Sequence, residues 1–195
     1  MQLASRHGLS RQLTENDDDR GINVVMDAQE TGQAQQDGLK KLREEIKGIR
    51  IAMLTTAEQD GTLRARPMGT QEMDANGALW FFTSADSPKV DEVQQDRNVN
   101  ITYAKPDDHR WVSISGTAAL VRDHAKIEEL WNPLLKAWFP KGLDDPELAL
   151  LKVDIREAEY WDSNNGATVY AFNLARSIVT GQQPKTGDHQ KLDLA

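Results

Sequence analysis

The stretch RIAMLTTAEQDGTLRARPMG, residues 50–69, contains two segments of strand-forming residues on either side of Asp60-Gly61. An Asp-Gly pair in this setting is a strong signal for a hairpin turn, so we predict two antiparallel strands. Side chains two apart in a strand share a face, which places Arg64 and Arg66 together. Guanidinium groups are seldom buried without a partner, so these arginines are expected to face either a protein carboxylate or an anionic ligand.

Other segments of the chain also have the composition of β-strands, and residues 98–105 alternate apolar and polar side chains. Together with the hairpin they give about six antiparallel strands, connected by turns and a few short helices. This pattern predicts a mainly β fold, a closed or nearly closed six-stranded antiparallel barrel, with a Greek-key sandwich as the alternative. The further strands are expected at residues 78–84, 98–105, 111–121 and 150–161.

Two apolar stripes at helical spacing predict helices. Leu39, Leu42, Ile46 and Ile49 indicate a short amphipathic helix before the first strand. A second helix is expected from Asp123, with a broad apolar face. That face would carry Ile127, Leu130, Trp131, Leu134, Leu135 and Trp138.

The polar ends of the chain are expected to lie outside the domain. Residues 1–36 are rich in Gln and Asp and lack sustained periodicity, which predicts a mobile or loosely docked arm. Residues 37–162 form the predicted domain. Residues 163–195 are expected to form a C-terminal helix and a polar tail, the tail beginning at Thr180.

Composition excludes several classes of protein. A net charge of −8 and an isoelectric point near 5.0 argue against nucleic acid and against an anionic membrane surface. The absence of cysteine excludes disulfides and thiol chemistry, and the scattered histidines predict no metal site. No apolar leader or membrane span is recognised, so a cytoplasmic location is expected.

The segment TSADSPKV, residues 83–90, predicts the start of a helix beside the end of a strand. Ser87 is a natural N-cap and Pro88 suits the first helical position, which places Lys89 in the first turn. Backbone N–H groups, the helix dipole and an ammonium group together favour a phosphate. The alternative is that Lys89 is simply solvated.

Five tryptophans are many for 195 residues, and an aromatic cofactor ring is one use for them. Trp131 and Trp138 lie on the predicted helix face and are expected to fill the core or a subunit interface. Trp161 ends a strand and is open to either interpretation.

The motifs RPM (66–68), WFFT (80–83) with Lys89 six residues later, ISGTA (114–118), WFP (138–140) and EYWD (159–162) occur in this order. In this order and spacing, residues 39–162 resemble the FMN-binding split barrel of the pyridoxamine 5′-phosphate oxidase superfamily, in its bacterial general stress protein branch. The resemblance implies a six-stranded split barrel that forms a homodimer, with two FMN sites at the subunit interface.

The resemblance also implies roles for individual residues. Arg66 and Lys89 would bind the flavin phosphate or, for Arg66, the ribityl chain. Pro67 and Met68 would run along the isoalloxazine by main-chain contacts. The cofactor-binding residues it implies are Arg66, Pro67, Met68, Phe82, Thr83, Lys89 and, from the other subunit, Trp161.

Departures from the oxidases argue against oxidation of pyridoxamine 5′-phosphate. Gln71 stands where those enzymes carry a lysine, Pro88 replaces an arginine, and no histidine follows Trp161 in the stretch ending at Thr180. Arg64 has no firm family role and is expected to form a salt bridge or a supporting contact.

The sequence is compatible with two functions. The first is an FMN-dependent oxidoreductase that takes hydride from a small molecule or a reduced nicotinamide, with no catalytic side chain of its own. The second is a non-catalytic flavin-binding or flavin-sensing stress protein that acts through a protein partner.

Overall fold

The computed structural model describes residues 17–162 and 188–194. The chain divides into two units, Met1–Gln36 and Asp37–Ala195. In the first unit the described residues, 17–36, are helical and belong to α1 (Asp17–Ile46). The sequence predicted this helix only near Leu39, because the preceding residues show no apolar repeat; their Ala, Gln and Glu content nevertheless favours a helix.

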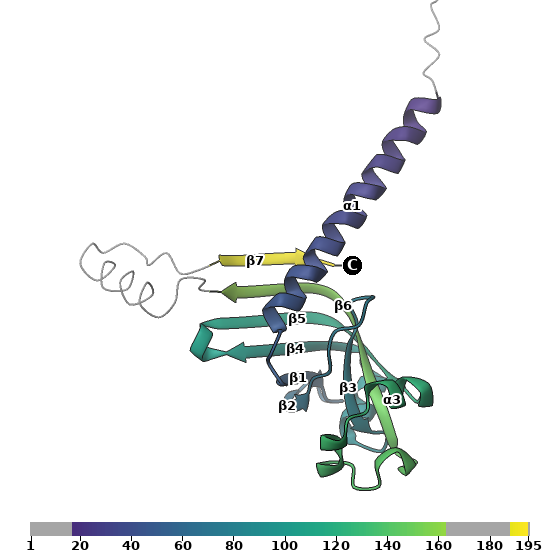
Figure 1. Cartoon of the computed structure of the whole chain (residues 1–195), viewed down its shortest axis with the longest axis vertical. Coiled ribbons are helices and arrows are strands. Elements are labelled where there is room, and N and C mark those ends of the chain that lie inside the picture. The colour runs from purple at the N-terminus through teal and green to yellow at the C-terminus, as the bar shows by residue number, and fades with distance from the viewer. Residues whose placement is uncertain (1–16, 163–187, 195) are drawn as a thin grey trace, which may run out of the picture. The chain divides into compact units, whose positions relative to one another are not determined.

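The second unit is built on a curled antiparallel sheet (Figure 1). Its main path runs β2-β1-β4-β5-β6-β3. A bridge between Thr70 and Phe81 brings the end of β2 against β3, so the sheet turns back on itself. The predicted six-stranded split barrel is therefore confirmed. Its strands are β1 (Ile51–Ala57), β2 (Leu63–Gly69), β3 (Leu79–Ser84), β4 (Asn98–Lys105), β5 (Arg110–Val121) and β6 (Leu148–Asp162).

A further strand, β7 (Asp188–Asp193), lies where the sequence predicted a polar tail. It pairs antiparallel with the Glu157–Asp162 half of β6. Leu194, just beyond it, is buried in the main core. The tail prediction is wrong for these residues, because a short polar edge strand carries too little apolar alternation to be recognised. The predicted C-terminal helix falls on residues 163–187, outside the described residues.

The first apolar stripe lies in the core of the barrel, where Leu42 and Ile46 are buried and Leu39 packs against them. Ile49 is also buried there, but it lies beyond the end of α1, so the predicted helix is confirmed only as far as Ile46. The largest fully buried side chains there are Tyr103, Tyr160 and Phe81.

The remaining helices are short: α2 (Pro88–Gln95), α3 (His124–Leu130) and the 3₁₀ turns η1 (Pro106–Asp108), η2 (Pro133–Ala137) and η3 (Gly142–Asp144). The long helix predicted from Asp123 is wrong, because Pro133 disfavours helical backbone at Asn132. As a result Leu134 and Trp138 are 77% and 71% exposed, and Trp138 does not fill the core. No described helix has the length and apolarity needed to cross a bilayer.

The longest strand, β6, organises the sheet. One of its edges pairs with β5 along its length, and its other edge pairs first with β3 and then with β7. The register between β5 and β6 shifts at Ser115/Gly116. A Cβ atom on Gly116 would lie 2.4 Å from the carbonyl oxygen of Asp154, so only glycine fits this close approach.

We expect Gly116→Ala to lower the free energy of unfolding by about 1–3 kcal/mol, as overpacking against backbone does. Urea denaturation measures the change. Gly69→Ala is the matched control, because a Cβ there would meet nothing within 4 Å. Equal stability of the two variants would contradict the close approach.

Candidate functional site

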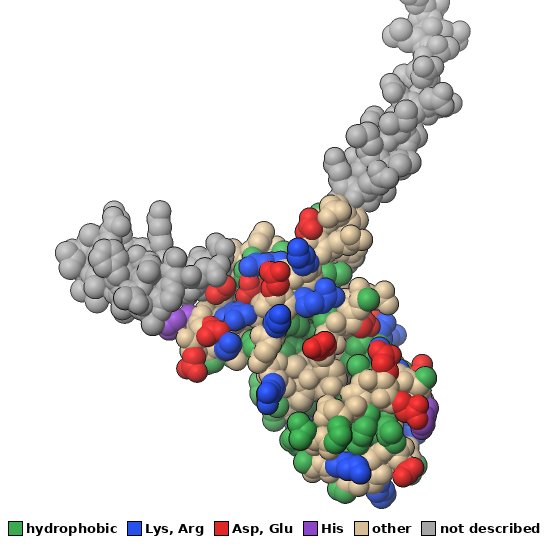
Figure 2. All heavy atoms as spheres, viewed as in Figure 1, with side chains coloured by type: hydrophobic (Ala, Val, Ile, Leu, Met, Phe, Trp, Pro, Cys, Tyr) green, Lys and Arg blue, Asp and Glu red, His purple; other side chains and the backbone are tan. Residues whose placement is uncertain are grey.

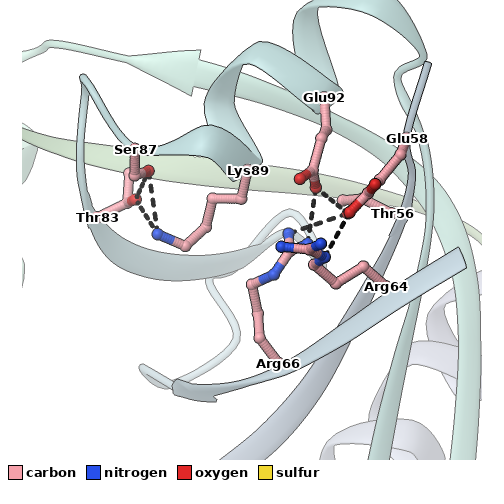
Figure 3. A network of polar contacts seen from close by, with 8 residues as sticks. All are labelled: Thr56, Glu58, Arg64, Arg66, Thr83, Ser87, Lys89 and Glu92. Atoms are coloured by element: carbon pink, nitrogen blue, oxygen red, sulfur yellow. Dashed lines mark hydrogen bonds and ion pairs between the residues drawn. The ribbon is translucent and has the colours of Figure 1, made fainter.

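Arg66 of β2 is held by two residues from other elements (Figure 3). Its guanidinium donates 2.9 Å to Thr56 Oγ1 of β1 and 2.7 Å to Glu92 Oε2 of α2. Thr56 in turn donates 2.5 Å to the same oxygen of Glu92. The side chains of Arg66 and Glu92 are only 17% and 11% exposed. This network fixes the guanidinium between strand and helix.

Both arginines of β2, Arg64 and Arg66, face protein carboxylates. Arg64 forms an ion pair with Glu58, which confirms the expected salt bridge. Arg66 pairs with Glu92, but the two bonds described above use only two of its five N–H donors. Three donors therefore have no partner among the described residues and remain available to a second anion.

Opposing effects set the acidity of Glu92. Burial raises its pKa, while the hydrogen bonds from Thr56 and Arg66 and the positive charge of Arg66 lower it. The net result is a pKa below the ordinary value, so Glu92 is an anion at neutral pH.

Lys89 is the cation of this site that lacks a carboxylate. Its Nζ donates 3.1 Å to Thr83 Oγ1 and 3.0 Å to Ser87 Oγ, as Figure 3 shows. Within the described residues it forms no ion pair. Burial and the nearby charge of Arg66 lower the pKa of Lys89 below its ordinary value, against the opposing charges of Glu92 and Asp86. A half-buried ammonium near a second cation is stabilised only when an anion joins it.

The start of α2 adds donors to this site. Ser87 is the N-cap residue as predicted, but its side chain makes no capping hydrogen bond to the helix. Its hydroxyl instead donates 2.8 Å to the carbonyl oxygen of Ser84 and accepts from Lys89. The helix N-terminus is thus left without a side-chain cap, next to the Lys89 ammonium, which is a favourable arrangement for an oxyanion.

The two predicted residues of β3 face different surroundings. Thr83 is buried, with its hydroxyl toward Lys89. The ring of Phe82 is also buried and packs edge-on against Trp131, with centroids 5.7 Å apart, and against Phe139 at 6.2 Å. Phe82 therefore supports the site from a second apolar cluster, and its ring is not presented to solvent.

Pro67 and Met68 lie on β2, at one end of the sheet path. Pro67 is exposed, whereas the side chain of Met68 is buried in the main core. The bonds from Thr70 N–H to Arg50 O and from Glu58 N–H to Thr62 O fix the alternation of the β1–β2 ladder. By this alternation Pro67, like residues 65 and 69, turns its main chain away from β1, toward the free edge.

Trp161 is the one predicted site residue that the fold separates from the others. It pairs with Trp111 at one end of β6, whereas Phe82 pairs with Leu150 near the other end. That separation is roughly 35 Å along the strand. Trp161 is 39% exposed and stacks on His189 of β7, with ring centroids 5.2 Å apart. Within one chain it does not meet Lys89.

Sequence reasoning missed Glu92 and Thr56 as partners of Arg66. Glu92 stands three residues after Lys89, on the same side of α2, and this spacing was the available signal. Nothing in the sequence around Thr56 indicated that β1 would contribute to the site.

The curled antiparallel barrel defines a split-barrel protein, and the cationic side chains between the edge strand β2 and the start of α2 are groups that could hold an anion. The chain belongs to the family described as pyridoxamine 5′-phosphate oxidase like, whose model matches residues 37–185.

The chain is also similar to individual proteins. The chain is similar to protein bli-3 of Neurospora crassa, with 29% identity over 143 residues, 68% of each chain. It is also similar to the general stress FMN/FAD binding protein of Xanthomonas citri, with 32% identity, a TM-score of 0.57, and 69% of this chain and 92% of that chain covered. General stress protein 26 of Bacillus anthracis shares the fold at 22% identity, with a TM-score of 0.55 and 64% and 92% of the chains covered.

We expect Glu92→Gln to destabilise the protein at neutral pH by roughly 1–3 kcal/mol, because it leaves the Arg66 charge uncompensated. A carboxyl whose pKa is lowered on folding stabilises the native state above its unfolded pKa, and this contribution is lost as pH falls through the folded pKa. The stability difference between parent and variant should therefore shrink as pH falls below 4.5, the ordinary value for glutamate.

Thermal unfolding followed between pH 3 and 7 measures this difference. Asp107→Asn, at an exposed carboxylate of η1 that forms no ion pair within the described residues, serves as the control and should show no such trend. A difference between parent and Glu92→Gln that stays constant across this range would contradict the assigned network.

Proposed function

We propose that this protein binds FMN, with the flavin phosphate held between Lys89, Arg66 and the start of α2. The observation that carries the proposal is Lys89, a half-buried cation with lowered pKa, no carboxylate partner among the described residues, and an uncapped helix start beside it. The donor set suits a phosphate: the ammonium of Lys89 and the spare guanidinium N–H groups of Arg66, beside the start of α2. The Xanthomonas citri relative, which binds FMN or FAD, supports the flavin assignment.

Each part of the site would have a separate task toward the cofactor. Glu92 and Thr56 orient Arg66, and Lys89 supplies the unpaired charge. The outward main-chain groups around Pro67 would lie along the flavin ring. When bound, the isoalloxazine supplies the capacity to accept a hydride, which the chain's own side chains lack.

The activity that fits best is a flavin-dependent oxidoreductase whose electron donor is a small molecule or a reduced nicotinamide. Gln71 and Pro88 stand where the true oxidases carry cations, so pyridoxamine 5′-phosphate is not the substrate that we propose. The alternative is a non-catalytic flavin-binding protein acting through a partner. The exposed Leu134 and Trp138 favour it, and Figure 2 shows hydrophobic side chains gathered over α3 and the segment that follows.

A homodimer is part of this proposal, because Trp161 would reach the flavin of a second copy. Ile51, Ala104, Trp111 and Trp161 form one row across the outer face of the sheet, by strand register. Ile51, Trp111 and Trp161 are 53%, 39% and 39% exposed. Large apolar side chains in such a row are typical of a surface that a partner covers.

Absorbance of the purified protein and titration with FMN and riboflavin test the phosphate site directly. We expect Lys89→Gln and Arg66→Ala each to weaken FMN binding by about 1–3 kcal/mol, as the loss of one charge-assisted contact does. Riboflavin lacks the phosphate, so its affinity should hardly change. Lys141→Gln, at an exposed lysine, is the control. Unchanged preference for FMN over riboflavin in both variants would overturn the phosphate assignment.

Lys89→Gln should also leave the flavin-free protein as stable as the parent, or more stable. A lysine whose pKa is lowered on folding disfavours the charged native state at all pH values below its ordinary pKa of 10.5. Thermal unfolding of flavin-free protein at neutral pH measures this effect. A large loss of stability would instead assign Lys89 a structural role.

We expect Ile51→Lys to shift the protein from dimer to monomer and to weaken FMN binding, although Arg66 and Lys89 are untouched. Light scattering after size-exclusion chromatography and an FMN titration report the two effects. Leu134→Lys, at the exposed apolar residue of η2, should change neither. A parent protein that is monomeric and still binds FMN tightly would exclude the dimeric site.

A further inference from the structure

A cavity lies away from Lys89, where the C-terminal part of α1 meets the start of β1 and the end of β2. Its volume is about 550 Å³, within the range of small-molecule sites. All its lining residues fall between positions 40 and 73. The flavin proposal does not assign it a ligand.

The charge of this cavity is opposite to that of the whole chain. Four cations line it, Lys40, Arg43, Lys47 and Arg50, against the two carboxylates Glu44 and Glu72. The chain carries a net charge of −8, so this excess of positive charge is local.

The cations of the cavity are mostly not neutralised by the protein. Lys40, Lys47 and Arg50 form no ion pair within the described part of the chain, while Arg43 donates 2.9 Å to the carbonyl oxygen of Asp74. A concave site with uncompensated positive charge attracts anions.

The walls of the cavity add an apolar component. Ile46, Ile49 and Met73 are almost fully buried and line its inner side. Thr70 and Gln71, which follow the last residue of β2, also line the cavity. An apolar wall with a cationic rim suits a ligand that has a planar or apolar body and more than one negative charge.

We propose that this cavity binds a phosphorylated small molecule of nucleotide size, in which the phosphates meet Lys47 and Arg50 and the apolar body packs on Ile46 and Met73. The site is separate from the one assigned to the flavin phosphate, and its occupancy does not depend on flavin binding.

Isothermal titration of the full-length protein with ADP, NADPH and inorganic pyrophosphate tests this proposal. We expect saturable binding of at least one nucleotide, with an affinity that falls as salt is raised. Arg50→Gln combined with Lys47→Gln should weaken it by about tenfold or more, as the loss of charged hydrogen bonds does. Lys141→Gln is the control at an exposed lysine outside the cavity.

Lys89→Gln separates the two sites. It should weaken FMN binding and leave nucleotide binding unchanged, and the Lys47/Arg50 double variant should do the reverse. No binding by any of the three probes, or binding that the double variant leaves intact, would overturn the cavity proposal without touching the flavin site. Loss of FMN binding in the double variant but not in Lys89→Gln would instead place FMN in this cavity and overturn both assignments.

Discussion

The backbone contact between Gly116 and Asp154 is the constraint on which the arrangement of this domain depends. It lies at the register shift between the two longest strands, β5 and β6. Along the edge opposite to β5, one half of β6 pairs with β3 and the other half pairs with β7. The register shift therefore determines where β3 and β7 lie relative to β5. The chain leaves β3 directly into α2, so the position of Lys89 follows from the pairing of β3.

Of the two cations at this site, Arg66 has a carboxylate partner and Lys89 has none among the described residues. Glu92 and Thr56 hold Arg66 in a fixed position, and the carboxylate of Glu92 compensates its charge. Lys89 has only hydroxyl partners among the described residues, at a cost that burial makes substantial. A neutral residue at this half-buried position would avoid that cost, and a cation with a perturbed pKa beside a second cation is typical of a binding site.

Much of this fold was predictable because its signals are local. The Asp60-Gly61 hairpin, the alternation of residues 98–105 and the Ser87-Pro88 helix start each act over a few residues, and all were placed correctly. The failures have physical reasons as well. α1 extends back to Asp17 through residues that favour a helix by their intrinsic propensity but show no apolar stripe. α3 ends at Leu130, earlier than predicted, because Pro133 disfavours helical backbone at the residue before it. Glu92 was missed as the partner of Arg66, because its spacing from Lys89 indicates only a shared side of α2 and does not show that this side faces β2.

The pairing of β7 with β6 bears on the order in which the chain can fold as it is synthesised. The Glu157–Asp162 edge of β6 has its partner only after residues 163–187 have also left the ribosome. Until then its backbone donors and acceptors are exposed, and the main core lacks Leu194. An open edge of this kind is where nascent chains pair with one another. The charged side chains of β7, among them Lys191, protect the finished sheet but cannot protect the unfinished one. Pairing between unfinished chains is therefore expected along the Glu157–Asp162 edge of β6, until β7 covers it.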